Sequence, residues 1–301
     1  MIAPVPRRGV PRRGLLSRIA AALALPAVLA ACSTAPRPAA GTSAPVRLDY
    51  GPDGSRFGEL TLPAGDGPVP VVVVVHGGFW RSGYGLELGR PLAVDLANSG
   101  VAAWNVEYRR VGGGGGWPAT FDDVAAAVDL LAGPVQDAAA GRLDLARVVA
   151  VGHSAGGHLA AWLAARPGLP DGAPGADPAV ALRGAVSQAG VLDLVDAAER
   201  SVGGSAVPDL MGATPGDDPR RYALASPVAR LPIGVPVVCV HGTDDANVPI
   251  RQSERFVAAA GSAGGTAELV TLPGVDHFAL IDPATEAWRA CREAALRLLA
   301  D

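Results

Sequence analysis

The sequence predicts an α/β domain built on a mostly parallel β-sheet that is flanked by helices. From Val46 onward, short apolar runs rich in Val alternate with longer Ala- and Leu-rich segments of helical period. This alternation is typical of β–α–β units. The apolar runs are continuous, as in parallel strands buried on both faces. The 301 residues, 49% of them hydrophobic, are enough for a sizeable core, so we expect one domain over residues 46–301.

Strands and helices are expected in alternation along this domain, after a β-meander over residues 46–62. Continuous apolar runs predict parallel strands at Val69–Val75, Val101–Val106, Val148–Val151, Gly184–Gln188, Val235–Val240 and Ala267–Leu272. Segments of helical period predict helices at Leu86–Asn98, Pro118–Leu131, Ala155–Ala165, Ile250–Ala260 and Pro283–Leu299. Residues 189–232 differ, because Pro, Gly and Asp recur and only short helices are plausible. An insertion of this kind often forms a small cap over a site.

The charge distribution argues against a nucleic-acid partner. The whole chain has 25 basic and 29 acidic residues, a net charge of −4, but residues 1–31 carry five arginines and no acid. The remainder therefore has 20 basic and 29 acidic residues, a net charge of −9. Such a domain lacks the basic surface that neutralises phosphates, so we expect no nucleic-acid binding.

The N-terminal segment has the features of an export signal. The basic stretch Arg7–Arg18 precedes the apolar run Ile19–Ala31, which has signal-peptide length and is too short to span a bilayer. Its paired arginines at 12–13 leave both the general secretory and the twin-arginine routes open. We therefore expect residues 1–31 to be a signal peptide.

The end of this segment indicates how the exported chain is held. The sequence LAAC at 29–32 resembles a bacterial lipobox, which implies lipidation of Cys32 and a membrane anchor facing outside the cytoplasm. The alternative is a secreted protein that is cut at an Ala-x-Ala-like site. Residues 32–45, rich in Ser, Thr, Ala and Pro, are expected to form a flexible linker.

The segment Gly152–Gly156, with the sequence GHSAG, has the context of a nucleophile elbow. It follows an apolar strand-like run and opens a predicted helix, as a GxSxG elbow requires. The sharp turn exposes the hydroxyl of Ser154, and small residues on either side avoid clashes. We expect Ser154 to be the nucleophile and the amide of Ala155, at a helix N-terminus, to stabilise an oxyanion. The alternative is that Ser154 only caps the helix.

The segment HGGFW at 76–80 follows the first predicted parallel strand, where a second oxyanion donor is needed. Glycines there let backbone amides approach a substrate closely. We expect the amides of Gly78 and Phe79 to join that of Ala155 in an oxyanion hole. The alternative is an ordinary glycine turn at a strand end.

Of the five histidines, His277 is the expected general base. His76 and His153 lie inside the two motifs, while His158 lies on the helix after the nucleophile and His241 ends an apolar strand. Only His277 follows the last predicted strand, in agreement with the expected order of nucleophile, acid and histidine. The histidines have neither HExxH spacing nor nearby cysteine pairs, so we expect no metal site.

The motifs HGGFW, GHSAGGH, HGTDDANVP and DHF, in this order, resemble the α/β-hydrolase superfamily from about Val46 to the C-terminus. HGGFW and the segment ASPV at 225–228 resemble its esterase branch, which includes kynurenine formamidases and hormone-sensitive-lipase-like carboxylesterases. Prolyl-oligopeptidase catalytic domains share the later motifs. Phe79 replaces the third glycine of the lipase-type HGGG, which moves the match toward the HGGYW of formamidases.

The resemblance also selects the acid of the expected triad. The segment at 241–249 resembles the family pattern HGxxDxxVP, and alignment of its Val-Pro pair implies Asp245 as the acid. Asp244 is then a turn or cap residue, and Asp193, after the preceding strand, is a further alternative. The implied mechanism is an acyl-enzyme mechanism that needs no cofactor.

The function implied by the resemblance and the export signal is a carboxylesterase that acts outside the cytoplasm on a small ester or amide. The alternatives are an arylformamidase, a prolyl-oligopeptidase-like peptidase and a catalytically inactive surface binding protein. Five aromatic residues are expected either in an acyl pocket or in the core: Phe79, Trp80, Tyr84, Tyr108 and Trp117. The sequence leaves open the oligomeric state and a disulfide between Cys239 and Cys291, which export permits.

Overall fold

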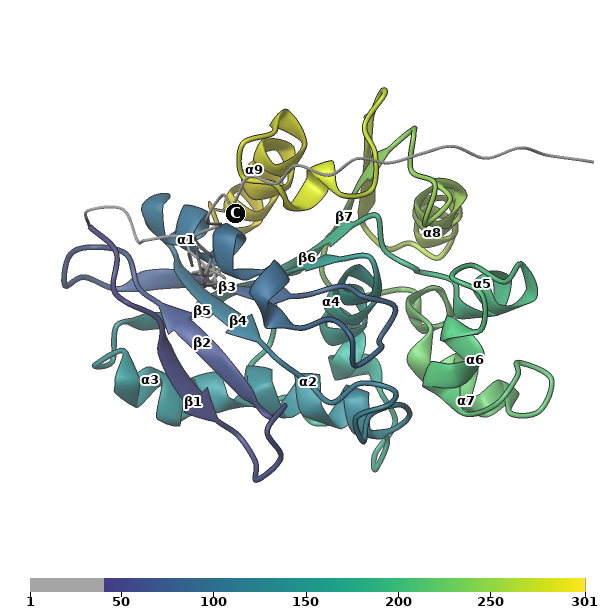
Figure 1. Ribbon diagram of the computed structural model, residues 1–301, viewed down its shortest axis with the longest axis horizontal. Helices are drawn as coiled ribbons and strands as arrows, with labels where there is room; N and C mark the ends of the chain where they lie inside the picture. Colours follow the sequence, from purple (N-terminus) through teal and green to yellow (C-terminus); the bar gives the residue numbers. More distant parts are fainter. Residues whose placement is uncertain (1–40, 301) are drawn as a thin grey trace, which may run out of the picture. The chain divides into compact units, whose positions relative to one another are not determined.

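A computed structural model describes residues 41–300, and its centre is an eight-stranded, mostly parallel sheet (Figure 1). The strands are β1 (Val46–Asp49), β2 (Phe57–Thr61), β3 (Val69–Val75), β4 (Ala102–Val106), β5 (Leu143–His153), β6 (Gly184–Gln188), β7 (Val237–Gly242) and β8 (Ala267–Leu272). Their order in the sheet is β1-β2-β4-β3-β5-β6-β7-β8. Strands β3 to β8 are parallel, and β1 and β2 add an antiparallel edge. The predicted α/β class is confirmed. The signal-peptide, Cys32 and most of the linker predictions lie outside the described residues.

Helices cover both faces of the sheet. The α-helices are α1 (Arg90–Asn98), α2 (Ala119–Asp129), α3 (Pro134–Ala138), α4 (Ala155–Ala165), α5 (Leu194–Glu199), α6 (Ala206–Met211), α7 (Pro219–Ala225), α8 (Arg251–Ser262) and α9 (Glu286–Ala300). The short 3-10 helices are η1 (Leu86–Leu88), η2 (Leu130–Ala132), η3 (Arg166–Gly168), η4 (Pro227–Arg230) and η5 (Ala279–Ile281). None of the helices within residues 41–300 combines the length and apolar character needed to cross a bilayer.

Two apolar clusters lie on opposite faces of the sheet, and β3 shows why its sequence is a continuous run of valines. Val71, Val73 and Val75 belong to the cluster that includes α2 and α4, whereas Val72 and Val74 belong to the cluster that includes α1 and α9. Successive side chains of a strand point to opposite faces, so both sets are buried.

The two cysteines lie in these different clusters. Cys239 is in the first cluster and Cys291 in the second, and both are free, buried thiols in the described part of the chain. The sheet separates them, so the disulfide that the sequence left open does not form between them. Burial raises the pKa of both thiols to about 12, which leaves them protonated and unreactive at neutral pH.

Several predicted elements match the structure residue for residue, while others differ from it in their bounds. Strands β3, β6 and β8 and helix α4 have the predicted bounds. The strand predicted from Val148 begins at Leu143 in the structure. The prediction missed its half-exposed first part because Asp144 and Arg147 interrupt the apolar run there. The predicted helix from Leu86 is divided at Gly89 into η1 and α1.

Two helix starts and one short helix also differ from the prediction. Pro118 is the N-cap of α2 instead of its first residue, and α9 begins at Glu286, three residues after Pro283. Proline fixes its own φ but does not decide whether it stands inside or just before a first turn. Helix α3 was not predicted, since its five residues are too few for a periodic pattern.

The insertion over residues 189–232 consists of α5, α6, α7 and η4, which confirms the predicted short helices. It packs against the loops that follow β3 and β4. The amide of Trp117 donates to the carbonyl of Leu210 at 2.7 Å, and Arg81 forms an ion pair with Asp209 at 3.3 Å. A side chain at Gly203 would collide with the ring of Phe79. The insertion therefore packs against the loop that carries the HGGFW motif and supports it.

Candidate active site

Ser154 lies on a strained turn between β5 and α4. Its φ of 56° and ψ of −116° are rare for a residue with a side chain. A Cβ atom at Gly152 would collide with the carbonyl of Gly156, and one at Gly156 with the carbonyl of Val75. The Ser154 side chain makes no capping hydrogen bond to α4, so the alternative of a simple helix cap is wrong. The turn has the geometry of a nucleophile elbow.

His277 lies in the loop after β8 and is paired with Asp245 from the loop after β7. Its Nδ1 is 2.6 Å from Oδ2 of Asp245. The other oxygen of Asp245 accepts hydrogen bonds from the amides of Asn247 and Val248, both at 2.8 Å. These bonds fix the carboxylate, and the carboxylate in turn fixes the orientation of the imidazole.

The other two candidate acids do not contact His277. Asp244 is exposed and accepts a hydrogen bond from the Thr243 hydroxyl at 3.0 Å. Asp193 caps α5 and forms an ion pair with Arg255 at 3.0 Å. Of the three carboxylates, only Asp245 therefore has the position that a triad requires.

The environment of Asp245 keeps it ionised. Burial alone would raise its pKa, but hydrogen bonds from His241, His277 and the amide of Val248 hold the pKa well below its usual range. His241 is itself fixed between the Ser253 hydroxyl at 2.8 Å and the Val248 carbonyl at 2.9 Å. An ionised Asp245 accepts a hydrogen bond from Nδ1 of His277, which leaves Nε2 as the basic nitrogen.

Ser154 and His277 face the same small cavity, which has a volume of about 70 Å³. The loops after β3, β5 and β8, together with η1 and η5, supply its wall: Gly78, Phe79, Tyr84, Leu88, His153, Ser154, His277, Phe278 and Ile281. The wall is mainly apolar. A larger hollow of about 420 Å³ lies in the insertion, and of the candidate site residues only Asp193 lines it.

The expected oxyanion donors lie beside Ser154. Gly78 and Phe79 have φ values of 111° and 54°, and both line the cavity. A Cβ atom at Gly77 would come within 2.8 Å of the His153 carbonyl and 3.2 Å of the Ser154 Cβ, so this loop packs directly on the elbow. Within residues 41–300, the amides of Gly78, Phe79 and Ala155 donate no hydrogen bond to another protein atom. Three free donors therefore lie near one hydroxyl.

His153 contacts the loop that carries His277, which the sequence did not indicate. Its Nε2 lies 2.9 Å from the His277 carbonyl, and the two rings are 4.4 Å apart. Burial, reinforced by the neighbouring His277, lowers the pKa of His153 to about 3. The ring is therefore neutral at physiological pH and donates to the loop that carries the base without placing a second charge beside it.

The aromatic residues near the strand ends divide between the site and the core. Phe79 and Tyr84 line the cavity, whereas Trp80 and Tyr108 are buried in the first apolar cluster. Trp117 packs edge-on against Phe121. His158 is also structural, since its Nε2 is 2.9 Å from the Ala225 carbonyl. In the described part of the chain, no three His, Cys, Asp or Glu side chains are arranged to hold a metal ion.

Comparisons with known proteins agree with this architecture. The family model described as BD-FAE matches residues 59–259. Esterase LipQ of Mycobacterium tuberculosis is 30% identical over 215 residues, which are 69% of this chain and 50% of LipQ. The chain thus spans about half the length of the curated relative it matches.

Solved structures show the same fold. A truncated carbohydrate esterase from gut microbiota superimposes with a TM-score of 0.74 at 21% identity, covering 88% of this chain and 99% of its own. The propionate-bound esterase Est2 of the planctomycete Thermogutta terrifontis is 25% identical, with a TM-score of 0.67 and coverage of 85% and 93%. These similarities confirm the α/β-hydrolase fold expected from the motifs.

Proposed function

The chain belongs to the BD-FAE family and to the esterase branch of the α/β-hydrolase superfamily, and from this premise we propose that it is an exported serine esterase for short-chain carboxylic esters. The observation that carries the proposal is the hydrogen-bonded pair of Asp245 and His277 on the wall of the small cavity that also contains Ser154. Esterase LipQ and Est2, both named as esterases, support the reaction class.

The proposed reaction begins with attack of the Ser154 oxygen on the acyl carbon of the ester. Nε2 of His277 takes the serine proton, and ionised Asp245 stabilises the imidazolium that forms. The negative charge on the former carbonyl oxygen accepts hydrogen bonds from the amides of Gly78, Phe79 and Ala155. These donors lie on the β3 loop and at the start of α4, two segments that meet beside Ser154.

The tetrahedral intermediate then collapses with cleavage of the carbon–oxygen ester bond. His277 gives its proton to the departing alkoxide, so an alcohol leaves and the acyl group stays on Ser154. A water molecule, deprotonated by His277, attacks the acyl-enzyme. The second collapse returns the proton to Ser154 and releases the carboxylic acid.

The size of the cavity supports a short acyl chain. Its volume of about 70 Å³ accommodates only a few carbon atoms, and Leu88, Phe79 and Ile281 give it apolar walls. Est2 is described with propionate bound, which is an acyl group of this size. At the rim, Tyr84 and Phe278 are 44% and 61% exposed, so they are available to contact the alcohol portion of the ester.

An arylformamidase activity is the second candidate. A formyl group is smaller than any other acyl group and also fits the cavity, and Phe79 gives the motif its formamidase-like form. The leaving amine needs the same protonation by His277 as an alkoxide does. The two candidates therefore differ in substrate and share the proposed chemistry.

The experiment that tests the proposed function compares substrates on one preparation of the purified protein and its Ser154→Ala variant. The panel is p-nitrophenyl acetate, butyrate and octanoate, N-formylkynurenine and a peptide p-nitroanilide. We expect acetate and butyrate to be cleaved at least about tenfold faster than octanoate, because longer chains exceed the cavity. Equal or faster octanoate cleavage would contradict the short-chain assignment.

The remaining outcomes discriminate the alternatives. Faster cleavage of N-formylkynurenine than of any ester would favour the arylformamidase, and p-nitroanilide cleavage would favour the peptidase. A folded protein that turns over none of the substrates would favour an inactive surface binding protein.

Export and lipid anchoring at Cys32 are proposed from the N-terminal sequence. Expression of the full chain in a bacterium with alkynyl palmitate should give a labelled membrane-bound protein. Cys32→Ala should abolish both the label and the membrane fraction. An unlabelled wild-type protein in the culture medium would instead favour the secreted form.

A further inference from the structure

The β3–η1 loop, residues 76–85, has a conformation that needs external support. Gly78, Phe79 and Trp80 have φ values of 111°, 54° and 53°, so three consecutive residues are in the left-handed region. Non-glycine residues persist there only when the surrounding structure holds them. The amides at two of these positions are the proposed oxyanion donors, so what holds the loop matters for the reaction.

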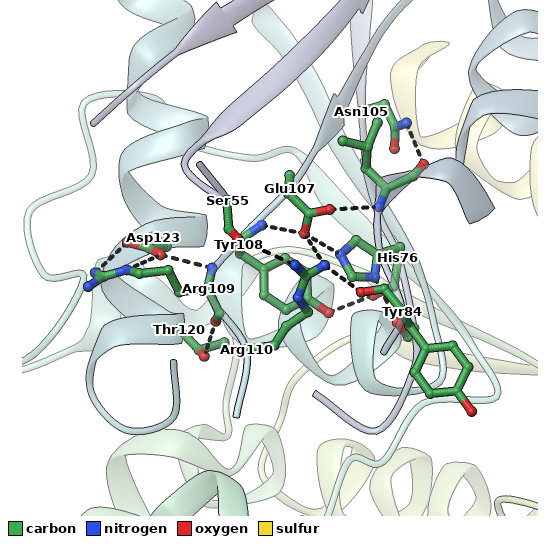
Figure 2. A network of polar contacts seen from close by, with 12 residues as sticks. Ser55, His76, Tyr84, Asn105, Glu107, Tyr108, Arg109, Arg110, Thr120 and Asp123 are labelled. Carbon is green, nitrogen blue, oxygen red and sulfur yellow. Dashed lines mark hydrogen bonds and ion pairs between the residues drawn. The ribbon is translucent and has the colours of Figure 1, made fainter. Parts of the chain in front are cut away.

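A single buried carboxylate contacts both ends of this loop, and Figure 2 shows the arrangement. Oε1 of Glu107 is 3.0 Å from Nε2 of His76, the first loop residue. Oε2 of Glu107 accepts a hydrogen bond at 2.9 Å from the amide of Leu86, the residue directly after the loop. Glu107 itself follows β4, the neighbour of β3 in the sheet.

Further contacts reinforce the attachment of the two loop ends to this carboxylate. Nη1 of Arg110 donates to Oε1 of Glu107 at 2.6 Å and also to the carbonyl of Tyr84, a residue that lines the cavity (Figure 2). The ring of Tyr108 stacks on that of His76 with centroids 4.4 Å apart, and its hydroxyl donates to the His76 carbonyl at 2.8 Å. The first residue of the loop, its penultimate residue and the residue after it are thus joined, directly or through Arg110, to one acceptor.

The electrostatics favour an ionised Glu107. Burial alone would raise its pKa, but the hydrogen bond and charge of His76, together with the amides of Leu86 and Tyr108, hold the pKa below its ordinary value. Hydrogen bonds to an ionised acceptor are stronger than neutral ones, and more so in a site that excludes water. Glu107 is 5% exposed, so little water competes for its oxygens.

We propose that Glu107 is a positioning residue of the esterase reaction: its carboxylate fixes both ends of the β3–η1 loop so that the Gly78 and Phe79 amides point into the cavity. This inference rests on the proposed function, because it assumes that these amides stabilise the oxyanion. Glu107 touches no reacting atom, and its effect passes through the loop. Loss of its charge should therefore weaken binding of the transition state more than binding of the substrate.

Asp123 provides a matched control. It is also a buried carboxylate, and it holds the segment after β4 from the other side (Figure 2). It accepts hydrogen bonds from the amide of Arg109 at 3.0 Å and from its guanidinium at 2.7 and 2.8 Å, and it pairs with Arg56 at 3.0 Å. Within residues 41–300 none of these contacts reaches the β3–η1 loop.

The test compares Glu107→Gln with Asp123→Asn on a short p-nitrophenyl ester, with the melting temperature of each variant measured in parallel. We expect Glu107→Gln to lower kcat by about 10- to 100-fold and to leave KM within about threefold, as loss of oxyanion stabilisation does. The affinity for an aryl trifluoromethyl ketone, which forms an oxyanion on Ser154, should fall in parallel with kcat. Asp123→Asn should lower the melting temperature but change kcat by less than about twofold.

The failures of the two proposals are distinguishable. A wild-type protein that cleaves no ester and takes up no fluorophosphonate would overturn the proposed function. An active wild-type protein in which Glu107→Gln and Asp123→Asn change kcat equally, or in which Glu107→Gln raises only KM, would overturn the positioning role.

If Glu107→Gln does not fold, Arg110→Met tests the same network with less damage, since it keeps the apolar stem of the side chain. It removes the donor shared by Glu107 and the Tyr84 carbonyl. We expect a fall in kcat of about three- to tenfold at unchanged KM, as expected for a weakened oxyanion loop. An unchanged kcat in a folded Arg110→Met variant would contradict the proposal.

Discussion

The nucleophile elbow and the β3–η1 loop hold similar strain in different ways. Ser154 and Phe79 have nearly the same φ, 56° and 54°, at the ends of the adjacent strands β5 and β3. At the elbow, backbone packs against backbone, and glycines at 152 and 156 make that approach possible. The loop depends instead on the side chain of Glu107, which follows the neighbouring strand β4, and on the insertion at Gly203.

Support by backbone packing and support by a charged side chain should therefore respond differently to substitution. Backbone packing fails when a side chain is added, because no room exists between the backbone segments. A charged support fails when its charge is removed, even though the packing is unchanged.

The largest effect is expected for Ser154→Ala, which removes the nucleophile and leaves the packing of the elbow intact. Loss of the serine in a hydrolase triad lowers kcat by roughly 10⁵- to 10⁶-fold. We therefore expect activity near background and a melting temperature within a few degrees of wild type. Ester hydrolysis above about 1% of wild type in this variant would contradict the assignment of Ser154.

The next effect is expected for Asp245→Asn, which leaves the shape of the acid nearly unchanged but favours the wrong tautomer of His277. We expect kcat to fall by about 10³- to 10⁴-fold. The adjacent Asp244→Asn is the matched control and should change kcat by less than about twofold, because Asp244 does not contact His277. Equal losses in the two variants would contradict the choice of acid.

The same variant gives a prediction on pH. Because the pKa of Asp245 is lowered on folding, its ionised form contributes stability above its unfolded pKa of about 4, and this contribution is lost as the pH falls toward the folded value. Urea unfolding should show that wild type is more stable than Asp245→Asn at pH 6 and that the difference shrinks below pH 4. A difference that grows in acid would contradict the sign.

A smaller effect is expected for Gly156→Ala, which tests the backbone packing at the elbow. The added methyl group would collide with the carbonyl of Val75, so the unfolding free energy should fall by about 1–3 kcal/mol. Gly261, in helix α8, has open space around its Cβ position, so Gly261→Ala should raise stability by about 0.5–1 kcal/mol. The same sign in both variants would mean that the packing at Gly156 is not what fixes the elbow.

The smallest effect is expected for Phe278→Ala at the exposed rim of the cavity. The centroid of its ring lies 5.3 Å from that of His277, but the ring takes no part in the proton transfers. We expect KM for aryl esters to rise by about three- to tenfold with kcat within about twofold, as loss of ground-state binding does. A large fall in kcat at unchanged KM would instead assign the ring to the positioning of His277.

The comparison also explains which parts of the site the sequence could predict. The elbow was predictable because its strand, serine, glycines and helix are contiguous, and the period of each element is visible. The role of Glu107 was not, since His76 and Leu86 lie 31 and 21 residues away from it along the chain. No local pattern marks a contact between neighbouring strands of the sheet.

The choice between Asp244 and Asp245 shows the same limit. The two residues are of the same type and adjacent in the sequence. Only the spacing to Val248 favoured Asp245 over Asp244 as the acid. The structure adds the reason, because the amide of Val248 donates to Asp245.

The fold was more predictable than the site, since continuous valine runs and helical periods repeat along the whole domain. The first part of β5 was missed where polar residues lie on its half-exposed face.

Covalent labelling tests directly whether Ser154 is a nucleophile that His277 activates. The protein would be treated with a fluorophosphonate and its intact mass and tryptic peptides measured, with His277→Ala in parallel. We predict one phosphonyl group per chain, located on Ser154, and at least about a thousandfold slower labelling of His277→Ala. A folded wild-type protein that remains unlabelled, or that carries the group on another residue, would contradict this role of Ser154.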